Sequence, residues 1–168
     1  MTEQQDTVSG EVPADVVTFW ESVPLFRMLE FIGFPEERWT PAQWMDEQAD
    51  LLSTDPASTP RRTLAPLPSG EMLVFDLTEH AEGYPLSVCE LGFPEDAVGI
   101  GLTIVEYLGL ATELAPLEAQ MLEGVYPFEA IVSAFERRGL QDNEYWSEHL
   151  ATLAETRSET EQRLREAF

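Results

Sequence analysis

The densest group of side chains that could do chemistry surrounds a predicted hairpin turn and consists of Asp76, Glu79, His80 and Glu82. Carboxylates and imidazole bind divalent cations, but a metal site needs three or four ligands that converge on one point. Neighbouring residues on a tight turn point in divergent directions instead. In a chain with 32 acidic residues, one histidine beside two glutamates is also expected by chance. We therefore predict no metal site here and no cofactor.

The other candidate catalytic groups are isolated from one another. Cys89, the only cysteine, falls in an apolar predicted strand of a strongly acidic chain, which disfavours a thiolate, so we expect a core residue. His149 precedes Leu150 on the last predicted helix and is expected at the surface or its boundary. Gly99 and Gly101 lack the third glycine and the βαβ context of a dinucleotide site, and we expect a flexible strand-to-helix turn there. We predict no catalytic residue.

The charge of the chain is the strongest constraint on its partners. The 168 residues include 32 acidic residues against nine arginines and no lysine, which gives a net charge of −23. Glutamate greatly outnumbers aspartate, which weighs against salt adaptation without removing it, and the missing lysines fit a bias in genome composition equally well. Phosphate groups are bound by cations, so direct binding to nucleic acid or to an anionic membrane is not expected.

The hydrophobic content of 43% is enough for this chain to fold despite its charge. We predict a mobile acidic tail at residues 1–12 and a single α+β domain at 13–168. A first helix starts at Asp15, is interrupted or restarted at Pro24, and continues as an apolar stripe that ends at Gly33. Further helices are predicted from a capping box at Thr40–Gln43 to Leu52, over 104–114 (apolar nearly all round and buried), from Pro116 to about Gly124, over 128–138, and from the residue after Asp142 to the end of the chain.

The middle of the chain favours strands. Residues 64–67, 71–78 and 85–91 are short, rich in β-favouring residues and separated by turn sequences, and they predict a three-stranded antiparallel meander. In the middle strand, Leu73, Phe75 and Leu77 should face one way and Met72, Val74 and Asp76 the other. The predicted fold class is therefore a mostly helical α+β domain, in which N-terminal and C-terminal helices flank a small antiparallel sheet.

An acid excess of this size could serve two kinds of binding. An inhibitor of a basic protein needs a moderate acidic patch that steers its partner, together with apolar contacts that set affinity. Hairpin turns and the loop at 92–97 are expected to be exposed, so the candidate contact residues are Glu79, Glu82, Glu90, Glu95 and Asp96. A DNA mimic needs about one charge per ~110 Å², roughly three times the average density that this chain can provide. Mimicry therefore requires the fold to gather carboxylates on one face.

Residues 64–108 resemble the SUKH superfamily. The matching features are a strand that ends in Asp76–Leu77, a hairpin to a second strand, and a helix that contains Tyr107–Leu108. The resemblance covers about a quarter of the chain and carries no catalytic residue across. It implies an immunity protein that binds and neutralises a toxin, often a nuclease or deaminase, or a scaffold.

Together, these features predict a cytoplasmic protein without catalysis that binds and inhibits a basic protein. The N-terminus lacks the features of a secretory signal, and no apolar run is long enough to span a bilayer. The first hypothesis is an immunity-type protein for a basic toxin such as a nuclease. The alternative is a DNA-mimic antirestriction or nuclease-inhibitor protein, and a metal-dependent enzyme comes third.

Overall fold

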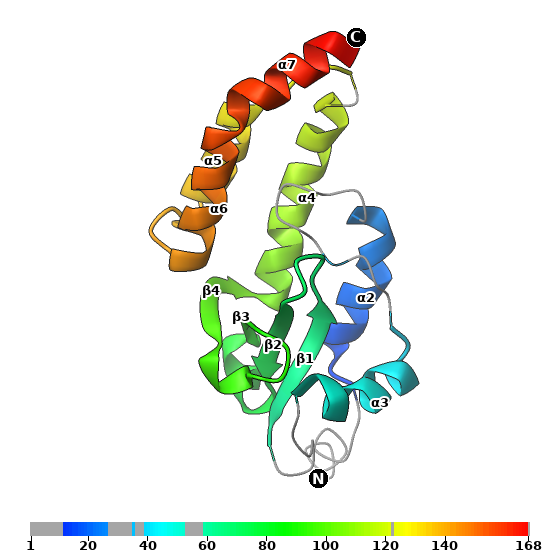
Figure 1. Cartoon of the computed structure of the whole chain (residues 1–168). Coiled ribbons are helices and arrows are strands. Elements are labelled where there is room, and N and C mark those ends of the chain that lie inside the picture. The colour runs from blue at the N-terminus through cyan, green and yellow to red at the C-terminus, as the bar shows by residue number, and fades with distance from the viewer. Residues whose placement is uncertain (1–11, 27–34, 36–38, 53–58, 122, 168) are drawn as a thin grey trace.

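A small sheet at one end and a group of long helices at the other make up the computed structural model, which describes residues 12–26, 35, 39–52, 59–121 and 123–167 (Figure 1). In chain order, the described elements are α2 (Ala14–Phe26), α3 (Pro41–Leu52), β1 (Arg61–Pro66), β2 (Met72–Asp76), the 3-10 helix η3 (Leu77–Glu82), β3 (Pro85–Cys89), the 3-10 helix η4 (Pro94–Asp96), β4 (Val98–Thr103), α4 (Ile104–Met121), α5 (Phe128–Glu136), α6 (Glu144–Glu155) and α7 (Arg157–Ala167). The α+β class predicted from the sequence is confirmed.

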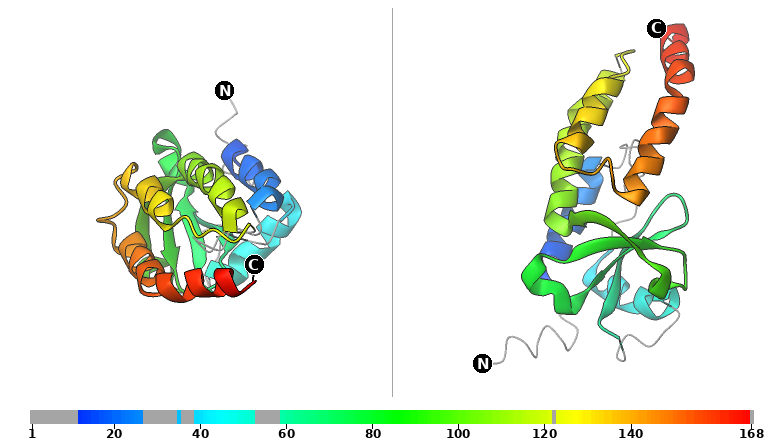
Figure 2. Two further views of the ribbon diagram at one scale, coloured as in Figure 1. Left: turned by 90° about the horizontal axis from the view of Figure 1, so that it is seen from above. Right: turned by 90° about the vertical axis from the view of Figure 1, so that its left-hand side faces the viewer.

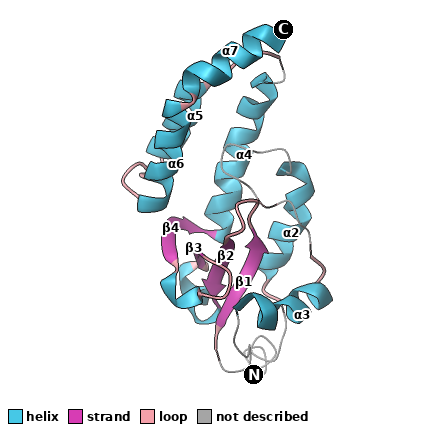
Figure 3. Ribbon diagram, in the orientation of Figure 1, coloured by secondary structure: helices cyan, strands magenta, loops and turns pink. Residues whose placement is uncertain are grey.

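The strands form an antiparallel sheet in the order β1-β2-β3-β4. Figure 3 shows these strands gathered at one end of the molecule, with α2 and α3 beside them. Helix α4 starts directly after β4 and runs away from the sheet, α5 runs back toward it, and α6 and α7 run away from it again (Figure 2). The sheet end and this helical arm therefore meet where β4 passes into α4.

The two faces of the sheet bury different clusters. Leu73 and Phe75 of β2 belong to the main core, together with Trp44, Phe19 and residues of α4, α5 and α6. Met72 and Val74 face the other way and form a second, small cluster with Cys89, which Leu51 and Ala97 cover in part. The predicted alternation along β2 is confirmed for these residues. Leu77, by contrast, lies beyond the strand and begins η3, because Asp76 ends β2 as the N-cap of that helix.

The outer edge of β1 is closed by two side chains from α3. The Gln48 carboxamide accepts a hydrogen bond from the Thr63 backbone N–H at 2.7 Å and donates one to the Thr63 carbonyl at 3.1 Å. The Trp44 indole N–H donates to the same carbonyl at 2.5 Å. An amide group that pairs with both backbone groups of a residue replaces a neighbouring strand at that position. α3 is thereby fixed to the edge of the sheet.

The edge formed by β4 is closed by an indole and a carboxamide from the start of α6, the same two kinds of group that close the edge of β1. The Trp146 indole N–H donates to the Ile100 carbonyl at 2.7 Å, and the Asn143 amide donates to the Gly99 carbonyl at 3.0 Å. The Asn143 side-chain oxygen also accepts from the backbone N–H groups of Tyr145 and Trp146. Asn143 is thus the N-cap of α6 and attaches that helix to β4.

Both predicted capping boxes are confirmed. The Thr40 N–H donates to Gln43 Oε1 at 2.9 Å, and the Gln43 N–H donates to Thr40 Oγ1 at 3.2 Å. Thr103 and Glu106 make the same reciprocal pair at the start of α4, again at 2.9 and 3.2 Å. Each box satisfies backbone donors that the first helical turn leaves without partners.

Several predicted boundaries are wrong, for identifiable reasons. α2 runs through Pro24. α4 runs through Pro116, because Leu114 and Leu117 on either side of this proline pack against the core and offset the one hydrogen bond that it removes. α4 buries one stripe rather than its whole surface, since Val105 is 58% exposed. The last predicted helix is in fact two helices, which are separated at Thr156. β1 starts at Arg61 rather than Leu64, and β2 and β3 are shorter than expected. The stripe beyond Phe26 and the tail up to residue 11 lie outside the described residues.

The fourth strand is the main feature that the sequence did not predict. β4 includes Gly99 and Gly101, which were expected to form a flexible turn. Gly101 has a φ of +73°, and a Cβ atom there would lie 3.2 Å from Leu140 Cδ2. Only glycine combines this backbone conformation with so close an approach of the chain before α6.

Gly101→Ala should therefore lower the free energy of unfolding by about 1–3 kcal/mol, through strain at positive φ and crowding against Leu140. Gly99→Ala is the matched control on the same strand, because a Cβ atom there meets nothing within 4 Å. Urea denaturation of both variants checks this. Equal stability of the two variants would contradict the role assigned to Gly101.

Candidate functional site

The segment from Glu90 to Val98, called the acidic loop below, combines exposed apolar and exposed acidic side chains. Its exposed apolar residues are Leu91 at 56%, Phe93 at 51% and Val98 at 38%. Its acidic residues, Glu90, Glu95 and Asp96, are exposed as well. An exposed aromatic residue among carboxylates is an arrangement suited to a protein partner, since the ring gives contact area and the charges select a cationic surface.

Hydrogen bonds attach the acidic loop to the sheet end at two points. Arg61 Nη1 donates to the Pro94 carbonyl at 2.5 Å, and the Gly92 N–H donates to the Leu51 carbonyl at the end of α3 at 3.2 Å. Turn bonds inside the loop, among them Asp96 N–H to the Phe93 carbonyl at 3.1 Å, shape it between these points. Phe93 is therefore presented by a segment that is already ordered, which reduces the entropy lost on binding.

The underside of the acidic loop lies against the small cluster that contains Cys89. Ala97 packs on Met72, Val74 and Cys89, and Cys89 itself is only 3% exposed. Burial raises the pKa of the Cys89 thiol to about 11; nearby Arg61 lowers it, and Glu95, Glu71 and Asp96 raise it further. The thiol is protonated at neutral pH and is a core residue, as expected.

The remaining predicted contact residues form a separate group. Glu79 and Glu82 belong to η3, which precedes β3 in the chain, whereas Glu90, Glu95 and Asp96 follow β3. All five side chains are exposed. The structure thus divides the candidate residues into two groups, and the exposed Leu91, Phe93 and Val98 belong to the group in the acidic loop.

The first cluster of chemically interesting residues has structural roles. The Asp76 carboxylate accepts hydrogen bonds from Thr78, including its N–H at 2.7 Å, and caps η3. The His80 ring packs edge-on against Tyr84. His149 is half-buried against Tyr145 and Trp146, at the boundary where it was expected. Among the described residues, no three His, Cys, Asp or Glu side chains lie close enough to hold a metal ion.

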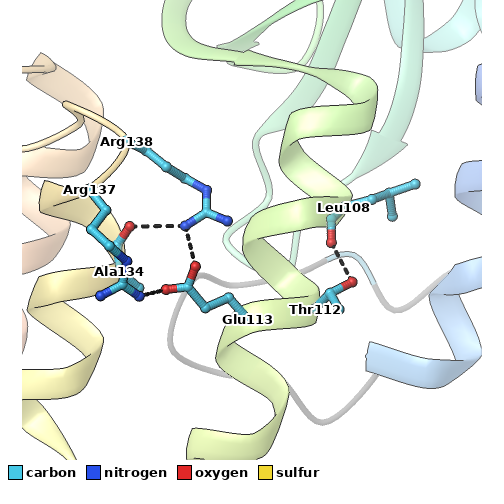
Figure 4. Close-up of polar contacts among 6 residues, drawn as sticks. All are labelled: Leu108, Thr112, Glu113, Ala134, Arg137 and Arg138. Carbon is cyan, nitrogen blue, oxygen red and sulfur yellow. Dashed lines mark hydrogen bonds and ion pairs between the residues drawn. The ribbon is translucent and has the colours of Figure 1, made fainter.

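Several of the described arginines bind other groups of the same chain. Arg61 and Arg62 donate to backbone carbonyls near β1. Arg137 and Arg138 at the end of α5 both bind the carboxylate of Glu113 on α4 (Figure 4). The distance from Arg138 Nη1 to Glu113 Oε1 is 2.6 Å. Arg157 contacts Glu129 and Glu161 and lies 4.6 Å from the centre of the Phe128 ring. Arg61, Arg137, Arg138 and Arg157 thus join separate elements of the fold.

Sequence reasoning found the acidic members of the acidic loop but missed Leu91, Phe93 and Val98. The available signal was the alternation of apolar and acidic residues within a Gly- and Pro-containing loop, since such a segment cannot bury all of its apolar side chains. The bond from Arg61 to Pro94, 33 residues away, has no local signal in the sequence.

Comparison with known proteins leaves the site without a precedent, because no family model, no curated protein and no solved structure matches the chain. A search of the described helices finds none with the length and apolar character needed to cross a membrane.

Glu113→Gln should lower the free energy of unfolding by about 1 kcal/mol, because two guanidinium groups lose the carboxylate that joins α4 to α5. Glu136→Gln on α5 is the matched control, and it should be neutral or slightly stabilising because it removes an exposed negative charge from a chain of net charge −23. Urea denaturation at low salt checks this. A loss of stability that is the same in both variants would contradict it.

Proposed function

We propose that this protein has no catalytic activity and binds and inhibits a basic protein through the acidic loop. The observation that supports this most directly is Phe93, half exposed beside Glu95 and Asp96 on a loop that Arg61 holds in place. Leu91 and Val98 extend the apolar surface.

In such a complex, charge affects mainly the association rate and apolar contact mainly the dissociation rate. The net charge of −23 attracts a cationic partner over long range and raises the association rate. Phe93 and Leu91 supply the desolvated contacts that slow dissociation. The partner that fits is a protein with an apolar pocket surrounded by arginine or lysine.

Within this class, we favour an immunity-type protein that neutralises a basic toxin such as a nuclease, because nucleic-acid enzymes present cations to bind phosphate. The resemblance to the SUKH superfamily points the same way. The residues that carry this resemblance have structural roles here, since Asp76 caps η3 and Tyr107 is buried in the core. The resemblance therefore adds nothing to the choice of contact residues.

Affinity capture followed by binding measurements with the purified partner tests the proposal. Wild-type protein, Phe93→Ser and Val125→Ser are used as baits at low and at high salt, and each retained protein is identified, purified and titrated by calorimetry. Val125 is the matched control, because both residues are 51% exposed and Val125 lies outside the acidic loop. A basic partner should bind Phe93→Ser at least about tenfold more weakly than wild type and Val125→Ser.

Other results would overturn the proposal. A set of DNA-binding proteins that bind all three baits equally and are released at high salt would indicate DNA mimicry, since mimicry depends on charge and not on Phe93. A partner that binds Phe93→Ser as tightly as wild type would show that the acidic loop is not the contact surface. Capture of no basic protein would contradict the whole proposal.

A further inference from the structure

The acidic loop covers a buried cluster, and few contacts hold it there. Beneath it lie Met72, Val74 and Cys89, on the face of the sheet opposite the main core. The loop continues from β3 and into β4, where Val98 pairs with Val88 of β3. Between these strands, the contacts that hold it over this face include the packing of Ala97, the bond from the Gly92 N–H to the Leu51 carbonyl, and the bond from Arg61 to the Pro94 carbonyl. A segment with so few attachments can open without unfolding the rest of the domain.

Of these contacts, the hydrogen bond from Arg61 is the one that involves a charged group. It is the first residue of β1, where it pairs with Asp76 of β2, and its side chain reaches the segment that follows β3. At 2.5 Å the bond from its guanidinium is short, and hydrogen bonds from charged donors are stronger than those between neutral groups. Its partner is a backbone carbonyl, so the bond fixes the path of the loop itself.

We propose that Arg61 is a positioning residue, which holds the acidic loop closed over Cys89 and thereby keeps Leu91 and Phe93 in the orientation that the partner binds. The importance of this position for binding rests on the proposed function. The closing of the loop by Arg61 does not depend on any partner and can be measured in the protein alone.

Cys89 provides the measurement, because it is the only cysteine and is buried under the loop. The rate at which the neutral reagent iodoacetamide alkylates Cys89, followed by mass spectrometry, reports how often the loop opens. Arg61→Met removes the donor and keeps much of the apolar volume of the side chain. It should raise the alkylation rate by about tenfold, the factor expected from loss of a hydrogen bond to a charged group.

The direction of the change in the alkylation rate shows whether Arg61 holds the loop closed or acts on Cys89 only through its charge. If Arg61 acted only through its charge, its removal would raise the pKa of Cys89 further and alkylation would become slower. If Arg61 holds the loop closed, its removal exposes the thiol and alkylation becomes faster. Slower or unchanged alkylation in Arg61→Met would overturn the proposal.

Two further variants and a second measurement complete the test. Arg163→Met, on α7, changes the net charge equally and should alkylate at the wild-type rate. Arg61→Lys keeps a cationic donor, so its alkylation rate should lie between those of wild type and Arg61→Met. Hydrogen exchange should accelerate at the amides of Phe93, Asp96 and Ala97, which donate the turn bonds of the loop, and remain unchanged in α4. Equal acceleration in α4 would show that Arg61 supports the whole fold, which would also overturn the proposal.

Binding to an identified partner is a separate measurement. If Arg61→Met opens the loop but the partner binds it normally, the positioning of the loop stands and the acidic loop is not the contact surface. If the loop stays closed in Arg61→Met, the positioning role fails whatever the partner does.

Discussion

The structure depends on how the two edges of one small sheet are closed. β1 and β4 each leave backbone groups facing outward, and each edge receives an indole N–H and a carboxamide: Trp44 and Gln48 on one side, Trp146 and Asn143 on the other. These bonds satisfy the carbonyls of Thr63, Gly99 and Ile100 and attach α3 and α6 to the sheet. The location of the acidic loop follows, because its Gly92 N–H binds the end of α3 and its Arg61 contact starts from the closed strand β1.

The charge of the protein acquires a clearer meaning once its cations are located. Arg137 and Arg138 are engaged with Glu113, and Arg61 and Arg62 with backbone carbonyls, so these arginines act as cross-links between or within elements. The exposed carboxylates of η3 and the acidic loop are left to face solvent. In a chain of net charge −23, these arginines therefore help to hold the described part of the fold against repulsion among the carboxylates.

Local patterns predicted local structure well and distant contacts poorly. The capping boxes at Thr40 and Thr103, the helix end at Leu52 and the alternation along β2 depend on residues a few positions apart, and the sequence was sufficient for them. β4 was missed because its two glycines have low strand propensity, and its place is fixed by Trp146 and Asn143, more than 40 residues later. For the same reason the carboxylates of the acidic loop were identified, whereas the exposure of Phe93 and the anchoring by Arg61 were not.

The closure of β4 by α6 also sets an order of events during synthesis. α3 and β1 are close in sequence, so the edge at Thr63 can be closed as soon as that strand has emerged from the ribosome. The edge at Ile100 stays open until Trp146 has been made, 46 residues later, and an open strand edge invites pairing with other chains. During that interval two nascent chains both carry many carboxylates and repel one another. The acidity of the chain thus opposes such pairing during synthesis.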